Sequence, residues 1–314
     1  MPASRPRLIP AVLALSASIA VLLAGCGGSG SDSTASGSGS SGGQLRVVAA
    51  EDFWGSIAEQ LGGDKVAVTN IITNPAADPH DYEPTAEDAK TLAGAEMSIV
   101  NGIGYDEWAS KLLAASPDEG RIELTVGDVV GLSNGDNPHQ WYSPETVHAV
   151  IDQIIADYKE ARPDDASYFD EQKEAFETEG LAEYNELIEA IKDEYSGTPV
   201  GASESIFEPL APALGLKLIT PKGFMDGIAE GTEPTPQEKA TADEQLKDKQ
   251  IELWVYNSQN TTPDVKRLNE EAEAVGIPIA TVTETMTPEG ASFQDWMSAE
   301  LKGIQKALGE AEGG

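Results

Sequence analysis

The chain has 314 residues, of which 40% are hydrophobic, so it is long enough to bury the cores of two domains. Its 54 acidic and 20 basic residues give a formal net charge of −34. This balance excludes nucleic acid as a ligand, because phosphate binding needs clustered Lys and Arg side chains. Acidity of this degree keeps a protein hydrated and also attracts cations.

Residues 1–25 have the pattern of a secretory signal peptide. Two arginines precede an apolar run from Leu8 to about Ala24, which is short for a membrane-spanning helix. The run ends in Leu-Ala-Gly-Cys, which resembles a bacterial lipobox, so we expect a lipid on Cys26; the alternative is an uncleaved membrane anchor. We therefore expect the protein at the outer, extracytoplasmic face of a bacterial cell membrane. Cys26 is the only cysteine, which excludes an intramolecular disulfide.

Residues 26–43 are mostly Gly and Ser and are expected to form a flexible tether. From residue 44 onward, short apolar strands alternate with amphipathic helices, which predicts a parallel sheet flanked by helices. We assign residues 44–162 to an N-terminal lobe. Its predicted strands are Leu45–Ala50, Val66–Ile72, Met97–Val100 and Ile122–Leu124. Its predicted helices are Phe53–Leu61, a segment capped by Thr85 that ends near Ala93, Asp106–Ala115 and Pro144–Ala161.

A helical pattern then runs from about Asp164 to Tyr195, which is long for one globular helix, and we interpret residues 163–196 as a helix that links two lobes. Residues 197–314 resume the β-α alternation and form the predicted C-terminal lobe. The predicted strands there are Pro199–Ala202, Leu216–Ile219, Ile251–Tyr256 and Ile277–Val282. The predicted helices are Ile206–Leu214, Gln237–Lys249, Thr262–Val275 and Phe293–Leu308, and Pro221–Gly231 is expected to be a loop. The fold class is therefore α/β, with two β-α lobes joined by a long helix.

Two of the three histidines stand in similar segments roughly sixty residues apart. These segments are PHDYEP, with His80, and PHQWYSP, with His139. A proline before each His stiffens the backbone, and neutral imidazole is the commonest metal ligand among side chains. The third histidine, His148, falls on a predicted helix and is expected to be structural or to face solvent.

Four potential metal ligands follow predicted strands, two in each lobe. His80 and His139 come after strands of the N-terminal lobe, and Glu204 and Glu284 follow strands of the C-terminal lobe closely. Parallel sheets bind ligands at the carboxyl ends of their strands, so we expect a site in the cleft between the lobes. Two imidazoles and two carboxylates suit Zn²⁺ or Mn²⁺. The fallback candidates for the fourth position are Asn257, Asp226 and Asp264.

These motifs resemble those of the zinc- and manganese-binding solute-binding lipoproteins of ABC importers, the cluster A-I or cluster 9 family. The resemblance covers residues 44–314, with DPHDYEPT similar to the family's first-ligand loop and NPHQW similar to its second. It implies that Glu204 takes the third ligand place, which is His in many zinc binders and Glu in many manganese binders. It implies that Glu284 takes the fourth, where Asp is more usual. The expected ligand is a transported Zn²⁺ or Mn²⁺ ion, and the expected partner of this monomer is an ABC permease.

Two other function classes compete with this interpretation. A surface adhesion protein could share the fold, because fold alone does not determine function. A metal-dependent hydrolase would need an open metal position and a general base, but the chain has no His-Glu-x-x-His motif. Ser203 also lacks the final glycine of a Gly-x-Ser-x-Gly nucleophile elbow. We therefore expect a binding protein and no enzyme, since a closed four-ligand shell suits capture of an ion.

Overall fold

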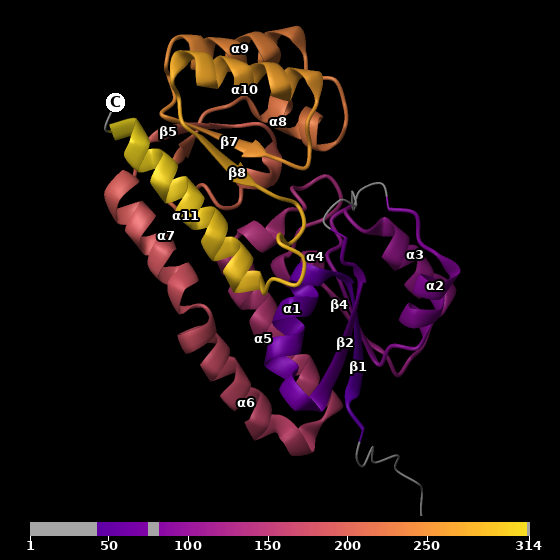
Figure 1. Cartoon of the computed structure of the whole chain (residues 1–314). Helices are drawn as coiled ribbons and strands as arrows, with labels where there is room; N and C mark the ends of the chain where they lie inside the picture. The colour runs from indigo at the N-terminus through magenta and orange to yellow at the C-terminus, as the bar shows by residue number, and fades with distance from the viewer. Residues whose placement is uncertain (1–42, 75–81, 313–314) are drawn as a thin grey trace, which may run out of the picture. The chain divides into compact units, whose positions relative to one another are not determined.

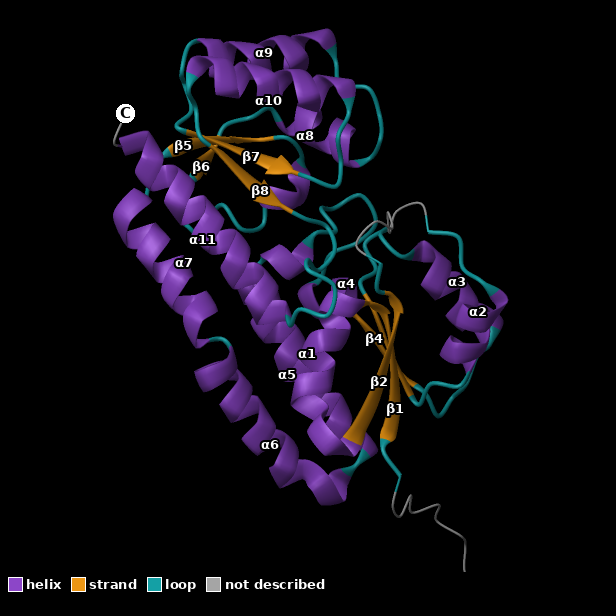
Figure 2. Ribbon diagram, in the orientation of Figure 1, coloured by secondary structure: helices purple, strands orange, loops and turns teal. Residues whose placement is uncertain are grey.

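Two four-stranded parallel sheets, one in each half of the chain, organise the computed structural model (Figures 1 and 2). The structure describes residues 43–74 and 82–312. The predicted signal peptide, the tether up to residue 42, Cys26 and His80 lie outside the described residues. The α/β class and the two β-α lobes predicted from the sequence are confirmed.

The sheet of the N-terminal lobe has the strand order β2-β1-β3-β4. Its strands are β1 Leu45–Glu51, β2 Val66–Ile72, β3 Met97–Val100 and β4 Ile122–Thr125. The helices of this lobe are α1 Asp52–Gly62, α2 Ala86–Ala93, α3 Glu107–Ala115, α4 Val126–Val130 and α5 Pro144–Ala161. Because successive strand residues point to opposite faces, Val47 packs into the core that includes α1 and α5, whereas Val48 packs against α2 and α3 (Figure 2). Helices therefore cover both faces, which explains the nearly continuous apolar strands.

The sheet of the C-terminal lobe repeats this arrangement with the order β6-β5-β7-β8. Its strands are β5 Pro199–Ala202, β6 Lys217–Leu218, β7 Leu253–Asn257 and β8 Ile279–Val282. Its helices are α8 Lys222–Ala229, α9 Pro236–Lys247, α10 Pro263–Val275 and α11 Phe293–Glu312. In both sheets the first and third strands of the lobe are neighbours, which places the topological switch point between them.

The passage between the sheets is helical but interrupted. It consists of α6 Ala166–Ala175, a π-helical turn over Phe176–Gly180, and α7 Ala182–Tyr195. The interruption ends at Gly180, because glycine has a low helix propensity. The Phe176 ring packs over this glycine, since an added Cβ there would lie 2.9 Å from the ring. Helix α7 lies alongside the last helix, α11 (Figure 1).

Two local predictions for the C-terminal lobe are wrong. Residues 221–231, expected as a loop, contain helix α8, which buries Phe224, Met225 and Ile228 at helical spacing. Two glycines obscured this pattern, and one of them, Gly227, lets Pro234 pack within 3.1 Å of the position of a Cβ. The predicted helix Ile206–Leu214 is only a 3₁₀ turn at Ser205–Phe207 followed by further turns, because Pro209 and Pro212 remove backbone donors.

Within residues 43–74 and 82–312, no helix has both the length and the apolar character needed to cross a bilayer.

Candidate metal centre

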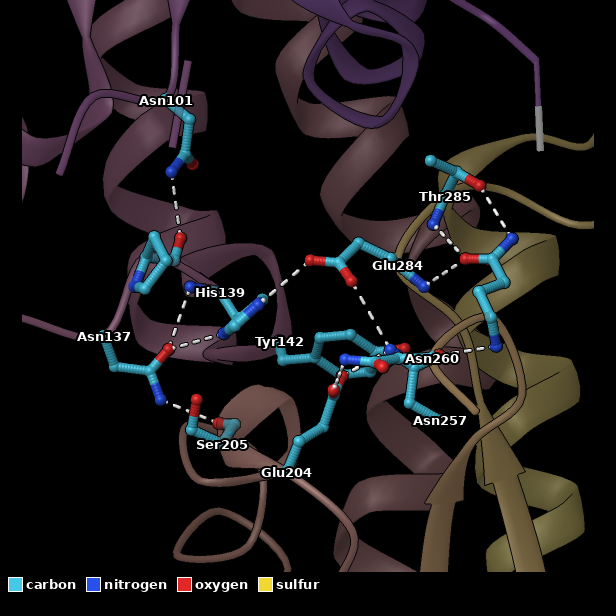
Figure 3. Close-up of polar contacts among 12 residues, drawn as sticks. Asn101, Asn137, His139, Tyr142, Glu204, Ser205, Asn257, Asn260, Glu284 and Thr285 are labelled. Carbon is cyan, nitrogen blue, oxygen red and sulfur yellow. Dashed lines mark hydrogen bonds and ion pairs between the residues drawn. The ribbon is translucent and has the colours of Figure 1, made fainter. Parts of the chain in front are cut away.

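Two buried carboxylates and an amide meet at the carboxyl ends of the strands in the C-terminal lobe. Glu204 comes two residues after β5, Asn257 ends β7, and Glu284 comes two residues after β8. All three side chains are buried. The Asn257 Nδ2 group donates to Glu204 Oε1 and, at 3.4 Å, to Glu284 Oε2 (Figure 3). Asn260 Nδ2 donates to Glu204 Oε2 at 2.6 Å, so both oxygens of Glu204 accept amide hydrogens.

The backbone that carries Glu284 is held by one glutamine. Gln259 Oε1 accepts the backbone N–H of Glu284 at 2.6 Å and that of Thr285 at 3.0 Å. Gln259 Nε2 donates to Thr285 Oγ1 at 2.8 Å. These contacts fix the short segment after β8 and direct the Glu284 side chain toward the N-terminal lobe (Figure 3).

His139 reaches this group from the N-terminal lobe. Its side chain is 1% exposed, and Nε2 lies 3.1 Å from Glu284 Oε1. Nδ1 lies 2.8 Å from Asn137 Oδ1, which is an acceptor, so Nδ1 carries the hydrogen of this pair. The edge-on ring of Trp141, 5.3 Å away, covers the imidazole. The ring therefore presents Nε2 to the carboxylates, as metal-binding histidines do when the other nitrogen is held by a polar partner.

The remaining sequence candidates occupy other positions. Asp226 pairs with Lys222 at 2.9 Å within helix α8, and Asp264 pairs with Lys239 at 2.7 Å. Asn257 lies in the centre, but it turns its donor toward the carboxylates, since its Oδ1 accepts the backbone N–H of Gln259 at 2.9 Å. His148, which was expected to be structural or to face solvent, is half-exposed and pairs with Glu177.

An amide group lies between the two carboxylates of this arrangement. Within the described residues, no three His, Cys, Asp or Glu side chains are grouped closely enough to hold a metal ion. The reason is visible at Asn257, whose amide nitrogen bridges Glu204 and Glu284 (Figure 3). His139 Nε2 and Glu284 Oε1, an imidazole nitrogen and a carboxylate oxygen, face each other across the lobes at 3.1 Å.

A cavity of about 200 Å³ opens beside His139 between the two lobes. Its lining includes Ile103, Asn137 and His139 from the N-terminal lobe and Ser205, Lys222 and Asp226 from the C-terminal lobe. Ile103 has a φ of 59°, which is strained for a β-branched residue. Ile103 also lines this cavity, so the strained turn after β3 lies next to His139 and Asn137.

Sequence reasoning missed a buried polar cluster that joins the two ligand segments. Tyr142 donates its hydroxyl to Glu300 Oε2 at 2.6 Å, and Thr283, next to Glu284, donates to Glu300 Oε1 at 2.8 Å. Trp296 Nε1 also donates to Glu300 Oε1 at 2.8 Å. Burial raises the pKa of Glu300 to about 7, although these hydrogen bonds oppose the shift. The only sequence signal was an acidic residue at a core-facing position of the last helix.

A second buried acid was missed at the end of β1. Glu51 is 1% exposed and lies beside Asp106, and burial, followed by the charge of Asp106, raises its pKa well above the ordinary value. Burial also raises the pKa of Asp106 to about 6. Asp106 accepts the backbone N–H groups of Asn101 at 2.6 Å and Gly102 at 2.8 Å. An acid directly after an apolar strand was the available signal, as it was for Glu204.

Comparison with known proteins decides the family. Residues 47–307 match the family model described as zinc-uptake complex component A, periplasmic (ZnuA). The chain belongs to this family. The resemblance inferred from the two Pro-His segments is thereby confirmed.

Characterised relatives and solved structures agree with this assignment. The manganese-binding lipoprotein MntA of Halalkalibacterium halodurans is 28% identical over 209 residues, covering 64% of this chain and 66% of MntA. The manganese ABC transporter substrate-binding lipoprotein PsaA of Streptococcus mitis is 25% identical, covering 86% of this chain and 91% of PsaA. The periplasmic zinc-binding protein TroA of Treponema pallidum has the same fold, with a TM-score of 0.69 at 16% identity, covering 85% of this chain and 99% of TroA. A Mn-bound periplasmic metal-binding protein of Candidatus Liberibacter asiaticus has a TM-score of 0.70 at 20% identity, covering 84% and 100%.

Proposed function

We propose that this ZnuA-family protein captures one divalent ion, Zn²⁺ or Mn²⁺, between its lobes with His80, His139, Glu204 and Glu284. The protein is the substrate-binding component of an ABC importer for zinc or manganese, and its family consists of transport proteins and not enzymes. The observation that carries the ligand assignment is the buried approach of His139 Nε2 to Glu284 Oε1, across the two lobes. An imidazole nitrogen and a carboxylate at 3.1 Å are two of the donor types that these ions prefer.

The identity of the transported ion depends on the chemistry of the ligands and on the availability of each metal in the cell. Glutamate at the third position, Glu204, favours Mn²⁺, in keeping with the manganese-binding names of MntA and PsaA. Zn²⁺ binds more tightly than Mn²⁺ to most sites of this composition, so selectivity in the cell would depend on availability and on site geometry. We propose Mn²⁺ or Zn²⁺ as the cargo, with no resident cofactor.

The protein works outside the cytoplasm, as relatives named lipoproteins or periplasmic proteins do. For this chain we propose a signal peptide over residues 1–25, a lipid on Cys26 and a tether over residues 26–43. We also propose the division into an N-terminal lobe (44–162), a linking helix (163–196) and a C-terminal lobe (197–314). The proposed partner is the membrane permease of the importer, which the monomeric binding protein would meet at the membrane surface.

The test is calorimetric titration of residues 43–314 with Zn²⁺ and, separately, Mn²⁺. The wild-type protein is compared with His139→Ala and Glu284→Gln, which remove a ligand from each lobe. His148→Ala is the matched control, because this half-exposed histidine contacts only Glu177 in the described structure. We expect one tightly bound ion per chain that both ligand variants lose and the control keeps. Binding that is indifferent to His139→Ala and Glu284→Gln would refute the proposed site.

A further inference from the structure

A single amide side chain, that of Asn137, contacts both ligand-bearing segments. Its Oδ1 accepts from the His139 backbone N–H at 3.0 Å and lies 2.8 Å from His139 Nδ1. Its Nδ2 donates across the lobes to the backbone oxygen of Ser205 at 2.7 Å and to Glu208 Oε2 at 2.9 Å. Ser205 directly follows Glu204. The amide therefore spans the distance from one proposed ligand to the residue next to another (Figure 3).

We propose that Asn137 is a positioning residue, which orients His139 for the ion and couples that orientation to closure of the two lobes. The proposal rests on the metal-capture function proposed above. The oxygen end of the amide acts on the ring: an acceptor at Nδ1 holds the hydrogen there and leaves the Nε2 lone pair free for the site. The nitrogen end of the amide donates to two acceptors on the opposite lobe, the Ser205 backbone oxygen and Glu208 Oε2.

The acceptors on the C-terminal lobe are themselves held in place. Glu208 Oε2 also accepts from Lys222 Nζ at 3.2 Å, and Lys222 donates to Asp226 Oδ1 at 2.9 Å. Asn137, Ser205, Lys222 and Asp226 all line the cavity beside His139. The contact thus forms part of the lining of the cavity that His139 also lines.

Side chains other than that of Asn137 also hold the backbone of this loop. Asn101 Nδ2 donates to the Pro138 oxygen at 2.9 Å, and Gln140 Nε2 donates to the Asn137 oxygen at 2.8 Å. These bonds tie the loop backbone to its own lobe. What the side chain adds is the connection from the His139 ring to Ser205 and Glu208.

A consequence for release follows from this geometry. Separation of the lobes must break both hydrogen bonds that Asn137 donates, while the amide is also bonded to the ring of His139. Opening would therefore loosen the imidazole and free the ion in one event. Removal of an outer partner of this kind typically lowers metal affinity by about 10- to 100-fold.

Two substitutions distinguish the contact made by the amide oxygen of Asn137 from the contacts made by its nitrogen. Asn137→Ala removes the contacts of both atoms. Asn137→Asp keeps an oxygen for His139 but sets a carboxylate against the Ser205 oxygen and the Glu208 carboxylate, so it breaks only the contact across the lobes. Asn134→Ala is the matched control, since Asn134 is exposed in the same loop and bonds to Glu107 of its own lobe.

The experiment reads the His139 ring directly. The chain has only three histidines, so ¹⁵N-labelled imidazole signals can be resolved by NMR in metal-free protein at pH 8, with His139 assigned from a His139→Gln variant. For this measurement the wild type and each variant also carry Glu284→Ala, because the Glu284 carboxylate faces Nε2 at 3.1 Å and would itself favour a hydrogen there. Zn²⁺ affinity and dissociation rate are measured on the corresponding proteins with Glu284 intact, after circular dichroism confirms that each is folded.

We expect Asn137→Ala to lose the Nδ1–H preference and to bind Zn²⁺ about 10- to 100-fold more weakly. Asn137→Asp should keep the preference and release Zn²⁺ about tenfold faster, and Asn134→Ala should match the wild type. A folded Asn137→Ala protein with an unchanged His139 tautomer would overturn the positioning role, whatever its affinity. If the wild-type protein bound no Zn²⁺, the proposed function would fail, and the tautomer comparison in metal-free protein would still decide the role of Asn137.

Discussion

The hydroxyl of Tyr142 offers a sharp test of how the two ligand segments are joined. It follows His139 by three residues, donates to Glu300 Oε2 at 2.6 Å and to the Thr283 oxygen at 2.8 Å, and accepts the Thr283 N–H at 3.3 Å. Tyr142→Phe deletes this one atom and keeps the ring, which packs edge-on against Trp296. The change leaves Glu300 with two of its three side-chain donors.

The magnitude follows from the charge on the acceptor. A hydrogen bond to a charged buried group contributes about 1.5–3 kcal/mol, whereas one between neutral groups contributes about 1 kcal/mol. We therefore expect Tyr142→Phe to lower the free energy of unfolding by about 2 kcal/mol when Glu300 is ionised.

The pH dependence has a definite sign. Burial raises the pKa of Glu300 from 4.5 to about 7, so between these values the folded state binds a proton that the unfolded state has lost. The contribution of Glu300 to stability is therefore fully present below pH 4.5 and is lost as the pH rises to 7. The Tyr142 hydroxyl bonds more strongly to the ionised form, so the difference between wild type and Tyr142→Phe should grow from pH 5 to pH 8.

Urea unfolding of residues 43–314 at both pH values measures this difference. Tyr168→Phe is the control, because its hydroxyl accepts the N–H of Asp64 in an exposed contact. The double variant Tyr142→Phe with Glu300→Gln isolates the coupling between the two side chains. A loss at pH 8 no larger than that of Tyr168→Phe, or a loss that does not change with pH, would refute the reasoning.

Two further predictions concern a ligand and a pair of glycines. Glu204→Gln should weaken Zn²⁺ binding by at least about 100-fold, beyond the range of outer partners, because it removes the ligand charge and sets an NH₂ group against the donor of either Asn257 or Asn260. Calorimetry checks this beside the exposed Glu252→Gln, which should bind normally. Gly276→Ala should lower stability by about 1 kcal/mol, because Gly276 ends α10 at a φ of 77°. Gly303→Ala, inside α11 with open space around the added methyl group, should raise stability by up to about 1 kcal/mol in thermal unfolding; equal effects at the two glycines would contradict this.

Much of the fold could be predicted because local patterns and burial agree. Strands such as Val66–Ile72 and Met97–Val100 appear with the predicted bounds, since each is an apolar run bounded by turn residues. Helix α2 begins after Thr85, whose capping box with Asp88 is written in four consecutive residues. Helix α8 was missed because Gly223 and Gly227 lower helix propensity, and only tertiary packing stabilises such a segment.

The candidate site also combines features that local sequence patterns predict with features that depend on the tertiary structure. Glu204 and Glu284 could be proposed as ligands because each follows a strand closely, and parallel sheets gather such positions at one edge; His139, which lies beyond β4 and α4, was proposed from its Pro-His segment. The sequence gives no signal for the Asn137 contact to Ser205, whose partners are 68 residues apart. Nor does it reveal that the Asn257 donor faces the carboxylates, since the orientation of an amide is determined by its partners in the fold.

The strand registers show that each lobe places a glutamate opposite an asparagine at the ends of its two central strands, although the two pairs make different contacts. Ala202 pairs with Val255 and Ala49 pairs with Ile99, so Glu204 stands opposite Asn257 as Glu51 stands opposite Asn101.

In the C-terminal lobe the asparagine donates to its glutamate, and both lie at the proposed ion site. In the N-terminal lobe, Asn101 turns away and donates to the Pro138 oxygen, which supports the loop of His139, while Glu51 lies against Asp106.

Because the raised pKa of Glu51 favours its neutral form, Glu51→Gln is close to an isosteric change and should alter stability by less than about 1 kcal/mol. It should leave Zn²⁺ affinity unchanged in the calorimeter, whereas Glu204→Gln should weaken it by at least about 100-fold. A comparable loss of affinity in both variants would mean that residues equivalent in register are also equivalent in function.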